Sequence, residues 1–464
     1  ELNMSSVGQH KDSFDRTLGF RALLGVAIGL VVSQGVMVIM LRGAGFSELG
    51  FFIAMGFGYL LALSYVFSFS ELALMFPRAG TLSTYTEVAI GHFPAIVAVF
   101  SGYIVVAMFA LSAELVLIDL LLAELFPGVL PPMSVAFGVL IFLTLLNIRG
   151  VDLFASLQTF LACTMIISLL VVGGTAVFSS PDPAAYELSE FGTNSLDWGG
   201  LTLIALAIWG FVGAEFVCPL VEETKQPEKN LPRAMIAGVT VILFIYLFYC
   251  LGALFHVPTK TLAGSALPHL EYARAVFGEK GIVFLTIAAI TATCSTVNTT
   301  LAAVPRMLYG MAHNAQTFSI FKKLHGKYQT PWVAIVFIAF VTGVPILIYG
   351  ANADAILLLL TGAAVSWLIA YIIAHIDVMV LRYRMPNASR PFKTPLYPLP
   401  QILGIAGMVY AIIYAAPSPE LEGQVFSIAG AVLGIGAIIA AVWVKFVMKR
   451  GLFQPESVDH ALND

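Results

Sequence analysis

Apolar residues in this chain fall into long unbroken runs, and polar residues gather in the short stretches between them. A run of about 20 apolar residues is long enough to cross the hydrocarbon core of a bilayer as a helix. Runs near that length occupy residues 23–41, 47–76, 93–125, 130–148, 153–178, 200–221, 232–256, 281–310, 331–350, 353–381, 400–416 and 424–447. The pattern therefore predicts an all-α membrane protein with twelve transmembrane helices.

The composition supports this prediction and excludes several classes of protein. Of the 464 residues, 59% are hydrophobic and only 11% are charged, whereas a soluble domain carries about 25% charged residues. The four cysteines lie in apolar runs, which is typical of core residues rather than of a disulfide framework or metal cluster. The sequence has no CxxC or HExxH motif and no nucleophile–base pair, so we predict neither a metal site nor a catalytic site. No cleavable signal precedes the first run, so that run is expected to stay in the membrane.

Lysine and arginine are unevenly distributed between the two sides of the predicted membrane. With the N-terminus inside, 19 of them face the cytoplasm and 4 face outward, which together make the 23 in the chain. Cytoplasmic loops carry an excess of positive charge, so we predict an integral protein of the cytoplasmic (inner) membrane with both termini cytoplasmic. The acidic loop 179–199, which lacks lysine and arginine, is expected to face outward.

The sixth run, LTLIALAIWGFVGAEFVCPL, has features that a simple membrane helix avoids. Gly210 and Gly213 interrupt it, and Glu215 follows within the apolar stretch. An acid at membrane depth is costly, so it is a candidate functional residue. Glycines beside it predict a broken helix, which hydrocarbon tolerates only where the backbone faces protein or a wet cavity. We therefore expect a transporter's central site at this break.

The first run, LLGVAIGLVVSQGVMVIML, has matching features. Gly25, Gly29 and Gly35 interrupt it, and Ser33 and Gln34 lie near its middle. Two glycine-interrupted helices, five apart and predicted to run in opposite directions, are typical of an inverted five-helix repeat. Glycines also allow close helix packing, but the matched positions and the nearby acid favour the repeat.

Five motifs carry a resemblance to a known family. They are GLVVSQGVM in the first run, ELALMFPRAGTLSTYTEVAIGHF at 71–93, WGFVGAE with EETKQPEKNLPRA at 209–234, PRMLYGMAHN at 305–314 and RPFKTPLYPLPQILGI at 390–405. In this order the chain resembles the amino acid–polyamine–organocation transporter superfamily, and in particular its amino acid permeases. The resemblance implies a LeuT-like 5+5 inverted repeat with two added helices. The expected divisions are 1–20 (cytoplasmic segment), 21–180 (helices 1–5), 181–383 (helices 6–10), 384–450 (helices 11–12) and 451–464 (cytoplasmic tail).

The resemblance also assigns a substrate site to the two breaks. In relatives, amides at the first break bind the substrate carboxylate, and here Ser33 replaces the family's usual first glycine. Because of that change, the substrate could be an amine or a modified amino acid instead of a plain amino acid. The alternative is structural: the Ser33 hydroxyl itself caps the free amides. Trp209 matches an aromatic gate able to cover an ammonium group, with carbonyls beside it accepting from the substrate's amino group. The expected substrate-binding residues are Val32, Ser33, Gln34, Gly35, Val36, Val106, Ala110, Ile208, Trp209, Gly210 and Phe211.

Energy coupling is the part that the resemblance leaves open. Besides Trp209 as a gate, Glu215 and Glu114 are the candidate coupling or gating acids, although Glu114 lies nearer the outer end and can simply reach water. Some proton-coupled relatives carry a lysine on helix five, where this chain has Thr164 or Met165. Proton coupling through Glu215 and exchange without an ion are therefore both expected alternatives. Sodium, bound by the hydroxyls of Thr293, Ser295 or Thr296, is the less favoured one.

These patterns favour a secondary active transporter of amino acids that works by alternating access. A polyamine or organic amine transporter of the same fold is the alternative substrate class. An amino acid-sensing transceptor or a passive pore is the alternative of another kind, but the helices are too apolar for a pore lining. We expect no enzyme activity, cofactor or nucleic-acid partner, and a monomer or homodimer in contact with lipid.

Overall fold

The computed structural model describes residues 16–183, 198–350, 352–416 and 419–463, and the described chain is almost entirely helical. Most of the predicted N-terminal segment 1–20 and of the acidic loop 179–199 lies outside these residues.

The helices are α1 Phe20–Val31, α2 Gln34–Ser47, α3 Gly50–Met75, α4 Leu82–Ala89, α5 His92–Val99, η1 Phe100–Ile104, η2 Ala107–Leu111, α6 Ser112–Leu125, α7 Ser134–Arg149, α8 Val151–Phe178, η3 Trp198–Leu203, α10 Ile204–Trp209, η4 Ala214–Glu223, α11 Pro227–His256, α12 Thr259–Gly264, α13 Pro268–Phe277, η5 Gly278–Lys280, α14 Gly281–His313, η6 Ser319–Lys322, α15 Trp332–Tyr349, α16 Ala353–Arg384, α17 Leu399–Ile413, α18 Pro419–Val442, η7 Trp443–Val447 and α19 Val458–Asn463.

The helices have the length and composition of membrane spans. Within the described ranges, nine are long and apolar enough to cross a membrane, and the bent pair α1 and α2 raises this to ten. Two shorter apolar helices, α7 and α17, coincide with the fourth and eleventh predicted runs. Large apolar side chains such as Phe160, Phe178 and Leu347 are exposed on the outside of the bundle, which suits a lipid-facing surface. The all-α membrane prediction is confirmed, while the count of twelve and the inverted repeat stay predictions.

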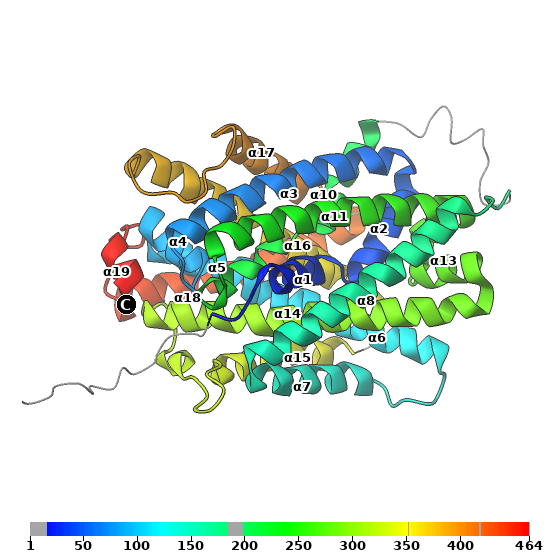
Figure 1. Cartoon of the computed structure of the whole chain (residues 1–464), viewed down its shortest axis with the longest axis horizontal. Helices are drawn as coiled ribbons and strands as arrows, with labels where there is room; N and C mark the ends of the chain where they lie inside the picture. The colour runs from blue at the N-terminus through cyan, green and yellow to red at the C-terminus, as the bar shows by residue number, and fades with distance from the viewer. Residues whose placement is uncertain (1–15, 184–197, 351, 417–418, 464) are drawn as a thin grey trace, which may run out of the picture.

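The broken first helix lies inside the bundle rather than at its edge. In Figure 1, α1 lies near the centre, α7 and α15 lie along one edge, and α17 lies at the opposite edge. Helix α1 contacts α8, α11, α14 and the 3₁₀ helix η4. Both glycine-interrupted runs therefore pack against each other at the centre, where their free backbone groups are shielded from lipid.

Two groups of ion pairs lie at one end of the bundle, and their carboxylates are buried. Arg306 on α14 donates through Nε and Nη2 to the carboxylate of Glu223, at 2.6 and 2.9 Å. Glu71 on α3 accepts from Arg382 at 2.7 Å and from Arg390 at 3.1 Å. A bidentate guanidinium–carboxylate pair fixes orientation as well as contributing free energy. The first pair joins α14 to η4, and the second joins α3 to α16 and to the segment that follows it.

The C-terminal tail packs against this same end. The backbone N–H of Glu456 donates to the Glu87 carbonyl at 2.8 Å, and its carboxylate lies 3.0 Å from His92 Nε2. Partial burial alone would raise the pKa of Glu456, but the His92 hydrogen bond and the charges of His460 and Arg450 lower it below its ordinary value. The tail is therefore held by its ionised carboxylate.

Candidate functional site

The first predicted break is present at Val32 and Ser33. Helix α1 ends at Val31, α2 begins at Gln34, and the two are bent by 55°. Ser33 is extended, and its hydroxyl accepts the Val36 N–H at 3.1 Å. This is the usual way for a serine to cap a helix N-terminus. The capping interpretation of Ser33 therefore describes its role in this structure.

The remaining free amides of α2 are bound by Glu114. Its Oε2 accepts from the Gln34 N–H at 3.0 Å, and its Oε1 accepts from the Gly35 N–H at 2.7 Å. A carboxylate is favourable at a helix N-terminus because of the free N–H groups and the helix dipole. A Cβ at Gly35 would collide with Glu114 Oε1, so glycine is required for this approach. The protein's own carboxylate thus occupies the place that the resemblance assigns to the substrate carboxylate.

The second predicted break separates α10 from η4. Helix α10 ends at Trp209, and η4 begins at Ala214. Gly213 has φ +112°, a conformation that L side chains rarely adopt. Two tyrosines satisfy the freed backbone: Tyr65 donates to the Phe211 carbonyl at 2.6 Å, and Tyr371 accepts from the Gly213 N–H at 3.0 Å.

Replacing Gly213 with alanine is expected to destabilise the break. A side chain at this φ is strained by about 1–3 kcal/mol, and the added Cβ would lie 2.6 Å from Leu30 Cδ2 on α1. We expect the thermal unfolding midpoint of the detergent-purified protein to fall. Gly174→Ala on α8 is the matched control, because nothing lies within 4 Å of its Cβ position. Equal midpoints for the two variants would contradict this account of the break.

Glu215 lies buried at the start of η4 and is held by three aromatic donors. Its carboxylate accepts from Trp367 Nε1 at 2.8 Å, from the Tyr371 hydroxyl at 2.6 Å and from the Tyr103 hydroxyl at 3.5 Å. Tyr371 also contacts the Gly213 amide, so the acid is linked to the break through one side chain. The carboxylate does not itself line the central cavity.

The two breaks meet at a small central cavity of about 30 Å³. This volume has room for a water molecule but not for an amino acid. Of the predicted site residues, six line it: Ser33, Val36, Val106, Ala110, Glu114 and Trp209. The other lining residues are Leu30, Val31, Ala107, Leu111, Val212, Phe216, Thr296, Thr300 and Trp367. The π-helical turn η2 carries several of them, and such turns are frequent at functional sites.

The other predicted site residues do not line the cavity. They are Val32, Gln34, Gly35, Ile208, Gly210, Phe211 and Glu215. The side chain of Gln34 turns away, with its amide nitrogen 3.0 Å from His269 Nε2 and its oxygen accepting from Thr293 at 3.3 Å. The 55° bend sets this direction, and residue order alone does not reveal it. Thr300 and Trp367 were not predicted because no local pattern marks them, and Thr296 was named only as a possible sodium ligand.

Trp209 offers the cavity a hydrogen-bond donor. Its side chain is buried, and its Nε1–H has no partner among the described residues. The ring meets Trp367 edge to face, with 5.7 Å between centroids. A buried donor without a partner is costly, so this N–H favours a polar ligand or water in the cavity.

The fifth predicted span is α8, and it hydrogen-bonds to α1 through Gln158 rather than through Thr164 or Met165. Gln158 Nε2 donates to the Gly25 carbonyl at 3.2 Å and to the Ser295 hydroxyl at 2.6 Å. Ser295 in turn donates to the Gly29 carbonyl at 2.9 Å. The oxygens named for a sodium ion are therefore engaged in helix-to-helix hydrogen bonds, which is the common role of such residues in membranes.

Known proteins match this chain over most of its length. A family model described as amino acid permease matches residues 18–441. The serine/threonine exchanger SteT of Bacillus subtilis is 27% identical over 86% of this chain and 90% of its own length. The glutamate/serine transporter AimA of the same bacterium is 26% identical, with 89% and 79% covered. A crystal structure of a mutant manganese transporter from Eremococcus coleocola shares the fold, with a TM-score of 0.62 at 11% identity and 93% and 94% covered.

Proposed function

Because this chain belongs to the amino acid permease family, we propose that it is a secondary active transporter that moves an amino acid by alternating access. The observation that carries this proposal is the meeting of both breaks at one cavity, lined by Ser33 from the first and Trp209 beside the second. Broken helices around a midplane cavity are the usual architecture of a transporter site. The ion pairs Arg306–Glu223 and Arg382–Glu71 then close the cytoplasmic end in this state, and must open for release.

We propose a small amino acid as the substrate. The relatives SteT and AimA are named for serine, threonine and glutamate. Val106 and Ala110 give the cavity a small apolar wall, which suits a short side chain. The substrate carboxylate takes the α2 amides of Gln34 and Gly35 when Glu114 leaves them. Carbonyls from Ile208 to Phe211 receive the amino group, and Trp209 covers it.

The coupling that we propose uses protons, with exchange as its alternative. Ionised Glu215 accepts from Trp367 and Tyr371, and a protonated carboxyl cannot keep both bonds unchanged because it becomes a donor itself. Proton uptake at Glu215 therefore loosens Trp367, which lines the cavity. In an exchanger, the binding free energy of an amino acid, rather than a proton, would drive the release of Trp367 from Glu215.

An amine transporter is the second candidate, and Glu114 is the observation that favours it. A fixed carboxylate already fills the α2 amide site, and a substrate without a carboxylate would not need that site. Such a substrate would place its ammonium against Glu114 in the cavity.

Flux into proteoliposomes tests the proposal. The full chain is reconstituted, and radiolabelled L-serine uptake is followed with and without an inward pH gradient, and with and without internal L-serine. Proton coupling predicts accumulation driven by the gradient, and exchange predicts uptake only with internal amino acid. A passive pore would equilibrate L-serine in every condition, and a transceptor would bind it without flux. Ethanolamine, which lacks the carboxylate, should be transported only by an amine transporter.

A further inference from the structure

An apolar groove runs along the outer surface of the bundle between α7 and α15. Its volume is about 340 Å³, and the two helices contact each other along one edge of the molecule (Figure 1). Leucine, isoleucine, valine and phenylalanine make up most of its wall, and Gly343 adds no side chain. Its one polar side chain, Thr144, donates to the Leu140 carbonyl at 2.6 Å. The groove, which we call the α7–α15 groove, therefore offers contacts to hydrocarbon and no free side-chain polar group.

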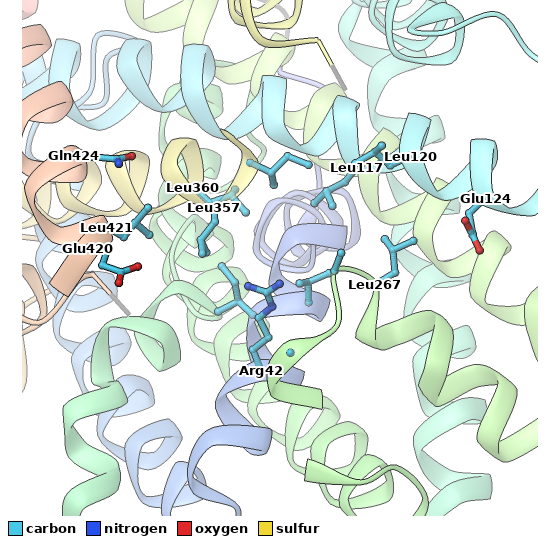
Figure 2. A pocket seen from close by; sticks show the side chains of 15 residues that line it. Arg42, Leu117, Leu120, Glu124, Leu267, Leu357, Leu360, Glu420, Leu421 and Gln424 are labelled. Atoms are coloured by element: carbon cyan, nitrogen blue, oxygen red, sulfur yellow. The ribbon is translucent and has the colours of Figure 1, made fainter. Parts of the chain in front are cut away.

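This lining distinguishes the groove from a larger cavity of about 660 Å³ beside α2. Figure 2 shows the charged side chains of Arg42, Glu124 and Glu420 among the leucines of that cavity. Charged groups need water or polar partners, so a hydrocarbon chain suits the α7–α15 groove and not the larger cavity. A flexible chain in the groove also gains dispersion contacts with both walls, which an empty groove would lose.

One end of the groove adjoins a basic segment. The Thr330 hydroxyl donates to the Ile148 carbonyl at 2.7 Å, so the segment 315–331 lies against the last turn of α7. Arg149 lies one helical turn beyond Leu145 of the groove wall. The exposed cations of this end are Arg149, Lys322, Lys323 and Lys327.

The charges of these cations are not neutralised by neighbouring acids. Residues 315–331 contain no aspartate or glutamate, and Asp152 is the only acid close to the four cations along the chain. Four positive charges and one negative charge leave an excess of three positive charges. Within the part of the chain that the structure describes, none of the four cations forms an ion pair. This end of the groove therefore attracts an anion.

The basic segment has the features of a membrane–water interface. Phe318 and Ile320 are exposed beside Lys322 and Lys323, an amphipathic pattern typical of interfacial segments. Lys323 Nζ lies 5.6 Å from the centre of the Trp332 ring, and tryptophan is enriched at membrane interfaces. The cations therefore lie at the level of lipid phosphates, while the groove extends from them along the spans.

We propose that the α7–α15 groove binds an anionic phospholipid, with an acyl chain along the groove and the phosphate at Arg149, Lys323 and Lys327. Each basic side chain near the membrane surface strengthens binding of an anionic head group by about fivefold. The inference does not rest on the proposed function, because the groove shares no lining residue with the central cavity and lipid binding is measured without transport.

Native mass spectrometry of the detergent-purified full chain tests the role of the cations. Dioleoyl phosphatidylglycerol and dioleoyl phosphatidylcholine are titrated separately, and the dissociation constants of the first bound lipid are compared. Wild type should bind phosphatidylglycerol roughly tenfold or more tightly than phosphatidylcholine. Lys323→Gln with Lys327→Gln should weaken phosphatidylglycerol binding roughly 20-fold and leave phosphatidylcholine unchanged. Lys225→Gln with Lys229→Gln is the matched control, because it removes two exposed lysines away from the groove, and it should change neither constant.

A second pair of variants tests the groove itself. The Cβ position of Gly343 lies 3.7 Å from Phe137, an ordinary contact, so Gly343→Leu fills the groove and should weaken phosphatidylglycerol binding while all the cations remain. Gly138→Leu on α7 is its control, because Gly138 does not line the groove and nothing lies within 4 Å of its Cβ position. If Gly343→Leu aggregates on size exclusion, Ala339→Leu fills the same groove and replaces it.

Three results would overturn the inference. They are equal affinity of wild type for the two lipids, equal losses in the two lysine pairs, and full phosphatidylglycerol binding by the groove-filling variant. Glycerol 3-phosphate, which has the phosphate but no acyl chain, should not displace the bound lipid. Displacement by it at the same concentration as the lipid would mean that the basic segment binds phosphate alone, and would also overturn the proposed site.

Discussion

Glu215→Gln is expected to cut pH-driven uptake of L-serine by roughly 10- to 100-fold, the range expected when hydrogen bonds to a buried charge are lost. Glutamine has nearly the same shape but cannot release or take up a proton. It also cannot accept from both Trp367 and Tyr371, because one end of its amide is a donor. Binding of L-serine should change by less than about threefold, because the acid does not line the central cavity. Uptake assays with a pH gradient and equilibrium binding measure the two effects separately.

Two tyrosine variants control this experiment. Tyr103→Phe removes a long contact of 3.5 Å to Glu215 and should leave uptake nearly unchanged. Tyr371→Phe removes a 2.6 Å bond to Glu215 and the partner of the Gly213 amide, so it should slow uptake more. Retained exchange of internal for external L-serine would show that Glu215→Gln still folds. Undiminished pH-driven uptake in that variant would remove Glu215 from the coupling mechanism.

The local features of the fold were predictable from the sequence. Apolar run lengths predict the spans because the bilayer sets the helix length. The break at Val32 and Ser33 follows from a capping residue beside a glycine, and the break near Gly213 follows from a residue free to adopt positive φ. Each of these signals lies within a few neighbouring residues.

The partners of these breaks could not be predicted in the same way. Glu114 meets the α2 amides from 79 and 80 positions along the chain, and Gln158 meets Ser295 from 137 positions away. Such contacts depend on how helices rotate and tilt against one another, and an apolar run carries little periodicity to fix this. For the same reason the sequence does not reveal that the side chain of Gln34 lies beside His269.

The position of Glu114 makes substrate binding a competition between two carboxylates. Ionised Glu114 holds the Gln34 and Gly35 amides, so a substrate carboxylate must displace it into an apolar cavity. Protonation removes the negative charge and weakens its hold on the amides, so wild-type affinity for L-serine should rise as the pH falls. An amine that binds ionised Glu114 through its ammonium would show the opposite trend. Its affinity would fall with the pH, because protonation of Glu114 removes the negative charge that the ammonium binds.

Glu114→Gln should therefore bind L-serine about tenfold more tightly than wild type at neutral pH, since the two charge-assisted bonds of Glu114 to the Gln34 and Gly35 amides no longer oppose the ligand. Its affinity should also lose the dependence on pH, which titrations of the purified protein at several pH values measure. Asp119→Asn is the matched control: it lies on the same helix and caps α7 through Met133 and Val135, at 2.9 and 3.2 Å. It should lower stability by about 1 kcal/mol and keep the pH dependence. Weaker binding of L-serine by Glu114→Gln, with ethanolamine binding lost as well, would mean that this carboxylate receives the substrate's ammonium and that the amine transporter is the correct function.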